Sequence, residues 1–219
     1  MLPLYVDMSD RLAVIVGGGR VASRKAEHLV SAGLALRIIS PAINEPLTLM
    51  MGQGRLEWVK REYIDGDLTH AALAVAATGD RTVNSRVAAE AKRLGILVNV
   101  ADCPKEGNCT FPAILRRGRL EVAVSTGGAS PAMASFVKGL ISGVVDEPYG
   151  AALEMVADLR EKLLTHEDSE KYNLQLVRKL MADGLMEHLR NRDTEAAVEL
   201  LREAVEALGL DPDALLRQK

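Results

Sequence analysis

The stretch AVIVGGGRVASRKAEHL, residues 13–29, runs from four apolar residues through three glycines into a segment with helical spacing. Apolar side chains recur in that segment at Val21, Ala22, Ala26 and Leu29, as they do on the buried face of an amphipathic helix. A buried strand that enters a helix through glycines is typical of the first βα unit of a dinucleotide-binding domain. The stretch therefore predicts a Rossmann-type α/β fold.

Further strands and helices alternate around this unit. Short apolar runs within residues 11–19, 34–41, 56–63, 71–80 and 96–102 predict strands, of which the first ends in the glycine turn and the fourth is ended by Thr78, Gly79 and Asp80. Helical spacing predicts helices over residues 20–33 and 81–95. Because strands joined through helices pair in parallel, we expect a parallel sheet that is covered on both faces.

The pattern changes after Pro104. Two apolar runs around the sequence RRGR predict a hairpin, and Ser130 followed by Pro131 predicts the start of a helix that ends near Val145. Helical periodicity dominates the rest of the chain. The expected helices there cover residues 148–164, 169–184, 185–191 and 193–209.

Composition limits the class of protein. Apolar residues make up 48% of the 219 residues and charged residues 26%, which is ordinary for a globular domain. Aromatic residues are only 3%, and no basic cluster is interleaved with them, which argues against nucleic-acid binding. No apolar run reaches the length of a membrane span, and the N-terminus lacks the pattern of a signal peptide. Cys103 and Cys109 have no histidine near them, so we expect no metal site, no disulfide framework and a cytoplasmic location.

Charge is unevenly distributed along the chain. Residues 1–146 carry 17 Lys and Arg against 14 Asp and Glu, whereas residues 147–219 carry 10 against 16. A mildly basic first part followed by an acidic second part favours an anionic ligand on the first part.

The glycine run reads Gly17-Gly18-Gly19-Arg20-Val21-Ala22, which is the pattern G-x-G-x-x-A. Gly17 would allow the tight turn, Gly19 would let the backbone approach a pyrophosphate, and the following helix would offer free amide groups. The alternative is a glycine-rich turn that holds no ligand.

The second strand leaves the choice between NAD and NADP open. An NAD site often has an acid about 20 residues after the glycines, where it holds the ribose hydroxyls. Here the strand ends with Ser40, Pro41 and Ala42, and Ser40 can form hydrogen bonds but carries no charge. Arg37 lies within the strand and is not obviously placed to meet a 2′-phosphate.

Polar residues follow the later strands, where ligands of such folds collect. Thr78 follows the fourth expected strand, and Asn99, Val100 and Asp102 end the fifth. Asp102 could act as a general base or orient a substrate, or it could be a turn or helix-capping acid before Pro104.

A second loop of glycines and hydroxyl groups, Ser125-Thr126-Gly127, enters the helix that begins near Ser130. This loop could bind an anion through its amide groups, or it could be an ordinary tight turn.

Three motifs occur in a fixed order: VIVGGGRVASRKAEHL, AATGDRTVNSRV leading to VNVADCPKEGNCTFPA, and LEVAVSTGGASPAMA. With them the sequence resembles the precorrin-2 dehydrogenase/sirohydrochlorin ferrochelatase family, the NAD-dependent part of siroheme synthase, in its free-standing form. The resemblance implies a Rossmann domain over residues 1–112, a small α/β dimerisation region over 113–146 and a C-terminal helical domain over 147–219. It also implies a homodimer.

The resemblance also implies an activity, the oxidation of the tetrapyrrole precorrin-2 to sirohydrochlorin with NAD as hydride acceptor. Asp102 takes the position of the family's catalytic aspartate. NAD contacts of the family fall by position on Arg20, Val21, Pro41 and Ala42, and the loop Ser125-Thr126-Gly127 falls on a family loop that we expect to contact the substrate. Some members also insert Fe²⁺ into sirohydrochlorin, and the sequence shows no dedicated iron ligands. The rival hypothesis is a non-catalytic, NAD-sensing Rossmann module.

Overall fold

The computed structural model describes residues 1–163, 169–207 and 209–213. The chain divides into two compact units. Unit 1 comprises Met1–Phe111 with Gly127–Ala129, and unit 2 comprises Pro112–Thr126 with Ser130–Lys219. The division into three functional regions at residues 112 and 146 stays a prediction.

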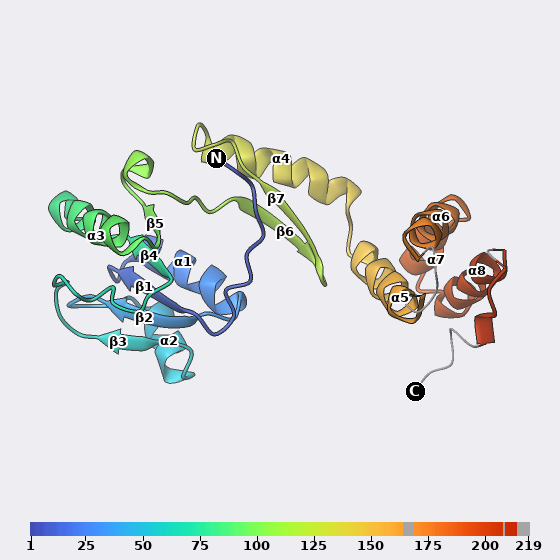
Figure 1. Cartoon of the computed structure of the whole chain (residues 1–219), viewed down its shortest axis with the longest axis horizontal. Helices are drawn as coiled ribbons and strands as arrows, with labels where there is room; N and C mark the ends of the chain where they lie inside the picture. The colour runs from blue at the N-terminus through green and yellow to red at the C-terminus, as the bar shows by residue number, and fades with distance from the viewer. Residues whose placement is uncertain (164–168, 208, 214–219) are drawn as a thin grey trace. The chain divides into compact units, whose positions relative to one another are not determined.

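Unit 1 contains a five-stranded sheet in the order β3-β2-β1-β4-β5, in which every pairing is parallel (Figure 1). This arrangement confirms the predicted Rossmann-type fold. The strand order reverses between β1 and β4, so a crevice forms beyond the carboxyl ends of these two strands. The strands are β1 (Leu12–Val16), β2 (Ala35–Ile39), β3 (Glu57–Val59), β4 (Leu73–Ala76) and β5 (Leu97–Val100).

Helices cover both faces of this sheet. Helices α1 (Arg20–Ser31) and α2 (Glu45–Gly52) share one apolar core with β1 side chains such as Ile15. Helix α3 (Arg81–Leu94) shares the other core with the alternate β1 side chains, such as Val16. Because successive strand side chains point to opposite faces, the continuous apolar run in β1 is buried on both sides, as the sequence predicted.

Helix α2 lies where the sequence analysis expected no element. Its N-cap residue is Asn44, whose side-chain oxygen accepts the Leu47 N–H at 3.3 Å, and Pro46 stands in the first turn. Leu47 and Met50 are buried against the sheet. An Asn followed closely by Pro is a recognisable helix start, so the signal was present but the helix is short.

Strand β3 is also shorter than expected, because the chain turns away after Val59. The guanidinium of Arg61 forms two hydrogen bonds with the Asp67 carboxylate at 2.6 and 2.7 Å. These bonds hold residues 61–67 as a loop that continues past the edge of the sheet.

Unit 2 begins with the antiparallel hairpin of β6 (Ala113–Arg117) and β7 (Leu120–Val124). Helix α4 (Pro131–Val144) follows, with Ser130 accepting the Met133 N–H at 3.1 Å as its N-cap. Both elements confirm the sequence prediction. The Arg117 guanidinium connects them, since it donates to the Val145 carbonyl at 3.1 Å and to the Ser142 hydroxyl at 2.9 Å.

The remaining helices of unit 2 pack around a separate apolar core that includes Leu159, Leu176, Leu185 and Leu201. Their positions follow the predicted helices, although residue 164 of one and residue 208 of another lie outside the described residues. None of the helices in the described ranges is both long enough and apolar enough to cross a membrane. These helices are α5 (Pro148–Leu163), α6 (Ser169–Ala182), α7 (Leu185–Arg190) and α8 (Thr194–Glu206).

Candidate active site

A cavity of about 370 Å³ lies at the carboxyl ends of the strands in unit 1. Its volume is within the range of small-molecule binding sites, and it occupies the place where folds of this class hold their ligands. The predicted residues Gly17, Gly18, Gly19, Ser40, Pro41 and Thr78 all line it. The other lining residues are Val16, Ile39, Glu62, Tyr63, Ala77, Gly79, Asp80, Val83 and Arg86.

The three glycines of the loop have different roles. A Cβ on Gly17 would lie 2.4 Å from the Ala77 carbonyl oxygen, and the φ of Gly17 is +121°. A Cβ on Gly18 would lie 1.9 Å from the Ala42 carbonyl oxygen. A Cβ on Gly19 would meet nothing within 4 Å. Gly17 and Gly18 therefore let the loop pack against its neighbours, whereas Gly19 leaves open space for a ligand beside the backbone.

The start of α1 is suited to an anion. Gly19 is its N-cap, no side chain caps it, and its first turn contains no acidic residue. By contrast α3 is capped by Asp80, which accepts the Thr82 N–H at 2.7 Å. Because the first amide groups of a helix have no partner within it, the exposed Arg20 and Val21 place free donors at the glycine loop. Together with the space beside Gly19, these donors fit a dinucleotide pyrophosphate.

Hydrogen bonds fix the end of β2 against the glycine loop. Ser40 donates its hydroxyl proton to the Ala42 carbonyl at 2.7 Å, and the Trp58 indole N–H donates to the Ser40 carbonyl at 2.9 Å. The Asn44 N–H donates to the Gly18 carbonyl at 3.0 Å. The Ser40 hydroxyl is thus occupied within the protein, and Ala42 lies next to the cavity lining without belonging to it.

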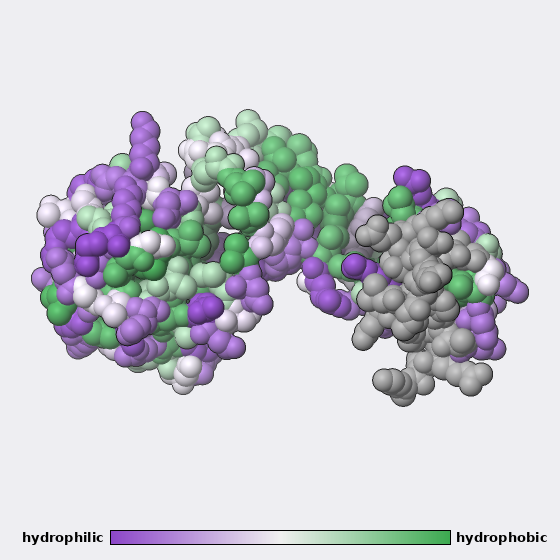
Figure 2. Space-filling view, in the orientation of Figure 1, coloured by the Kyte–Doolittle hydropathy of each residue, from purple (hydrophilic) through white to green (hydrophobic). Residues whose placement is uncertain are grey.

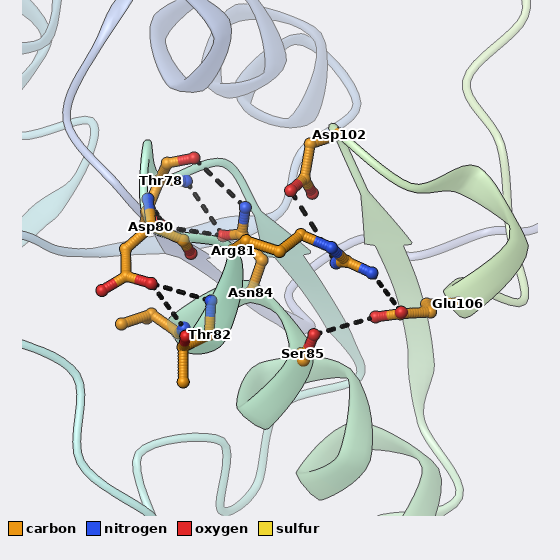
Figure 3. A network of polar contacts seen from close by, with 9 residues as sticks. Thr78, Asp80, Arg81, Thr82, Asn84, Ser85, Asp102 and Glu106 are labelled. Carbon is orange, nitrogen blue, oxygen red and sulfur yellow. Dashed lines mark hydrogen bonds and ion pairs between the residues drawn. The ribbon is translucent and has the colours of Figure 1, made fainter.

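A buried asparagine that the sequence analysis missed fixes the end of β4. The Asn84 carbonyl accepts both the Thr78 N–H at 3.1 Å and the Thr78 hydroxyl at 2.7 Å, and its amide donates to the Thr78 carbonyl at 3.1 Å (Figure 3). Asn84 is fully buried. An amide at helical spacing from the buried residues Val87, Ala88 and Ala91 is the signal that could have identified it.

Asn99 and Val100 at the end of β5 do not belong to the cavity lining. The Asn99 amide donates to the Cys109 carbonyl at 3.0 Å, and Val100 is part of the apolar core. Contact between these two residues and a cofactor stays a prediction.

Asp102 follows β5 with an exposed side chain. One Oδ of Asp102 lies 3.7 Å from a guanidinium nitrogen of Arg81, the first residue of α3. Arg81 also forms an ion pair with Glu106, which accepts the Ser85 hydroxyl at 3.3 Å (Figure 3). The Arg81 guanidinium holds the pKa of Glu106 below its ordinary value. An exposed carboxylate held beside a fixed cation is available for proton transfer.

Asp102 does not occupy the capping position that was the alternative role for it. Cys103 is the N-cap residue of the short 3-10 helix Pro104–Glu106, and no side chain caps that helix. Asp102 does not line the cavity, and its part in catalysis stays a prediction.

Tyr63 lines the cavity and was also missed by the sequence analysis. It is 5% exposed, and its hydroxyl donates to Glu90, which also accepts the Gly66 N–H at 2.8 Å. Burial and the Glu90 carboxylate raise the pKa of Tyr63. The Arg86 guanidinium lies 5.4 Å from the centre of the Tyr63 ring.

The loop Ser125-Thr126-Gly127 forms a tight turn. The Thr126 hydroxyl donates to the Ser130 carbonyl at 3.1 Å and accepts the Ser130 N–H at 3.0 Å. None of the three loop residues lines the cavity of unit 1, and their contact with a substrate stays a prediction.

Within the described part of the chain, no three His, Cys, Asp or Glu side chains gather as a metal site would require. Both cysteines are free.

Comparisons with known proteins bear on this site. Siroheme synthase of Pseudomonas paraeruginosa (strain DSM 24068 / PA7) is 40% identical over 162 residues, which are 74% of this chain and 35% of that protein. Siroheme synthase 1 of Aeromonas salmonicida (strain A449) is 33% identical over 200 residues, 91% of this chain and 43% of that protein. The chain thus spans less than half the length of these relatives.

A solved structure described as SirC, precorrin-2 dehydrogenase, superposes with a TM-score of 0.73 at 25% identity, covering 95% of this chain and 99% of that one. These comparisons confirm the family resemblance found in the sequence. The family model NAD_binding_7, described as "Putative NAD(P)-binding", matches residues 4–113, which include the whole cavity. The chain therefore belongs to the NAD_binding_7 family of NAD(P)-binding domains.

Proposed function

We propose that this protein binds NAD and oxidises precorrin-2 to sirohydrochlorin in siroheme biosynthesis. The observation that carries the proposal is the glycine cradle at the uncapped start of α1, which opens onto a cavity at the carboxyl ends of the strands. The likeness to siroheme synthases and to SirC supports precorrin-2 as the substrate.

When bound, NAD supplies the hydride acceptor of the reaction. The residues present fit NAD. Gly17 and Gly18 shape the loop, and the backbone at Gly19 and the first amides of α1 would hold the pyrophosphate. Thr78, which Asn84 holds in place, lines the cavity beside them. Substrate oxidation removes one hydride and one proton from the macrocycle. Asp102 accepts the proton as general base, and Arg81 holds its carboxylate in place.

We propose that the macrocycle carboxylates are met by the mildly basic part of the chain, residues 1–146, with the Ser125-Thr126-Gly127 loop among the substrate contacts. Asp102 and this loop have no role in a protein that only senses NAD. That difference separates the enzyme from the rival hypothesis of a regulatory module.

We also propose a homodimer in which a second copy covers α4. Four large apolar side chains on that helix are 53–69% exposed, at a spacing of three or four residues that places them on one face. Figure 2 shows the hydrophobic surface over this helix. A two-fold interface uses the same patch on both subunits, and such an interface would cover this face on each copy. The four residues are Met133, Phe136, Leu140 and Val144.

The decisive experiment supplies precorrin-2 and NAD⁺ without oxygen and follows NADH and sirohydrochlorin by absorbance. We expect both products to appear together. A folded protein that binds NADH but does not oxidise precorrin-2 would contradict the proposal and favour the sensing module. Adding Fe²⁺ to preformed sirohydrochlorin tests metal insertion separately, and fractionating cells tests the expected cytoplasmic location.

A further inference from the structure

We infer that Glu62 replaces the acid that is missing from the end of β2 and makes this site prefer NAD over NADP. The inference rests on the proposed NAD binding and names the residue that selects between the two cofactors. Its basis is the carboxylate of a cavity-lining residue, with which no residue in the described part of the chain pairs.

The topology brings Glu62 to the end of β2. Strands β2 and β3 pair in parallel, with Ile39 opposite Val59. The Ser40 N–H donates to the Val59 carbonyl at 3.3 Å, so the chain that leaves β3 starts beside the residues that end β2. Ser40, Pro41 and Glu62 all line the same cavity. The corner where the acid of a typical NAD site would stand is therefore reached from the neighbouring strand.

The backbone on both sides of Glu62 is held in place. The Arg61 guanidinium donates to the Glu62 carbonyl at 2.9 Å while it is paired with Asp67. The next residue, Tyr63, is buried and donates its hydroxyl to Glu90. Because its neighbours are fixed, the backbone of Glu62 is held at the cavity lining without the cost of ordering a mobile loop.

The neighbouring charged side chains already have partners within the protein, whereas none of the described residues pairs with the Glu62 carboxylate. Among the cavity residues, Arg86 is paired with Asp65 at 2.8 Å, and Asp80 caps α3. Arg37 on β2 is paired with Glu57 at 2.7 Å. The Glu62 carboxylate forms no hydrogen bond or ion pair with any residue in the described ranges. This corner of the cavity therefore carries a negative charge that is free to meet a ligand.

A free carboxylate discriminates between the two cofactors in a simple way. It accepts hydrogen bonds from the ribose hydroxyls of NAD, and such bonds to a charged group are strong. NADP carries a 2′-phosphate with a charge near −2 at neutral pH, which the carboxylate repels. We expect a preference for NAD of about ten- to a hundredfold, the range that one charge-assisted hydrogen bond supports.

Fluorescence titrations with NADH and NADPH on the full chain test the inference without requiring turnover. The variants are Glu62→Gln, Glu62→Arg and the control Glu27→Gln, which removes the same charge from the exposed surface of α1, outside the cavity lining. We expect the wild type and Glu27→Gln to prefer NADH at least about tenfold. Glu62→Gln should reduce the preference about tenfold, and Glu62→Arg should reverse it.

The outcomes separate this inference from the proposed function. If NADH binds tightly and Glu62→Gln keeps the wild-type preference, the role of Glu62 is overturned while NAD binding stands. Equal affinity of the wild type for both cofactors overturns it as well. If the folded wild type binds neither cofactor, as checked by circular dichroism, the proposed function fails together with the inference.

Discussion

Replacing Gly18 with alanine should destabilise unit 1, whereas replacing its neighbour Gly19 should mainly weaken cofactor binding. The added Cβ at Gly18 would lie 1.9 Å from the Ala42 carbonyl oxygen and 2.9 Å from the Ser40 hydroxyl oxygen. The loop must therefore move by more than about 1 Å to reach ordinary contact distances. Such overpacking typically costs about 1–3 kcal/mol.

The displacement also breaks a hydrogen bond. The Asn44 N–H donates to the Gly18 carbonyl at 3.0 Å, and its loss adds about 1 kcal/mol. We therefore expect Gly18→Ala to lower the free energy of unfolding by about 2–4 kcal/mol. A Cβ on Gly19 meets nothing within 4 Å, so Gly19→Ala costs at most about 1 kcal/mol, as a poorer N-cap.

Trp58 provides the assay. It is the single tryptophan of the chain and lies on β3, so its fluorescence during urea unfolding reports on unit 1 alone. Binding of NADH is titrated in parallel. Gly19→Ala should keep nearly wild-type unfolding yet bind NADH at least about tenfold more weakly, because its methyl group occupies the space beside the first amides of α1. A Gly18→Ala variant as stable as the wild type, or a Gly19→Ala variant with unchanged affinity, would refute these separate roles.

Four further predictions concern other parts of the molecule. Asp102→Asn should lower the rate of precorrin-2 oxidation by about 10²–10⁴-fold with unchanged NADH affinity, because the base is lost, and a near-normal rate would remove Asp102 from catalysis. Arg81→Gln should reduce the same rate less, as the carboxylate loses its cation at 3.7 Å, and a loss equal to that of Asp102→Asn would argue against a merely positioning role. Phe136→Glu should convert the expected dimer into a monomer in light-scattering measurements, since Phe136 is 62% exposed at the centre of the apolar face of α4, and a persistent dimer would exclude this face. Burial raises the pKa of Cys109 to about 11. Because only the thiolate reacts, alkylation of Cys109 in a Cys103→Ser background should accelerate about tenfold per pH unit from pH 8 to 10. A plateau of the alkylation rate below pH 10 would contradict the raised pKa.

Much of the fold follows from local sequence patterns. The four apolar residues before Gly17 and the helical spacing after it predict β1 and α1, because side-chain periodicity and glycine conformations depend on neighbouring residues only. The same reasoning located the hairpin and the helix that Ser130 caps. It missed α2, whose eight residues contain too few turns for a clear period.

The candidate site also contains residues that local sequence patterns predict and residues that they do not. The sequence predicted that the glycines and the ends of β2 and β4 lie together, since parallel strands bring their carboxyl ends to one edge of the sheet, and these residues line one cavity. Sequence position could not reveal that the Asn99 amide donates a hydrogen bond to the Cys109 carbonyl, ten residues further along the chain. Nor could it reveal that Asn84 fixes Thr78, because a buried hydrogen bond depends on how a helix is rotated against the sheet.

The sequence by itself thus determined that a strand, a glycine turn and a helix would form a dinucleotide cradle, because these features depend on residues that are neighbours in the chain. Only the tertiary structure decided which side chains meet across 20 or more residues. It placed Arg81 between Asp102 and Glu106, and it brought Glu62, which follows β3, to the cavity that Ser40 and Pro41 also line. The interaction energy of two charges depends on their distance in space, and sheet order and helix packing set that distance.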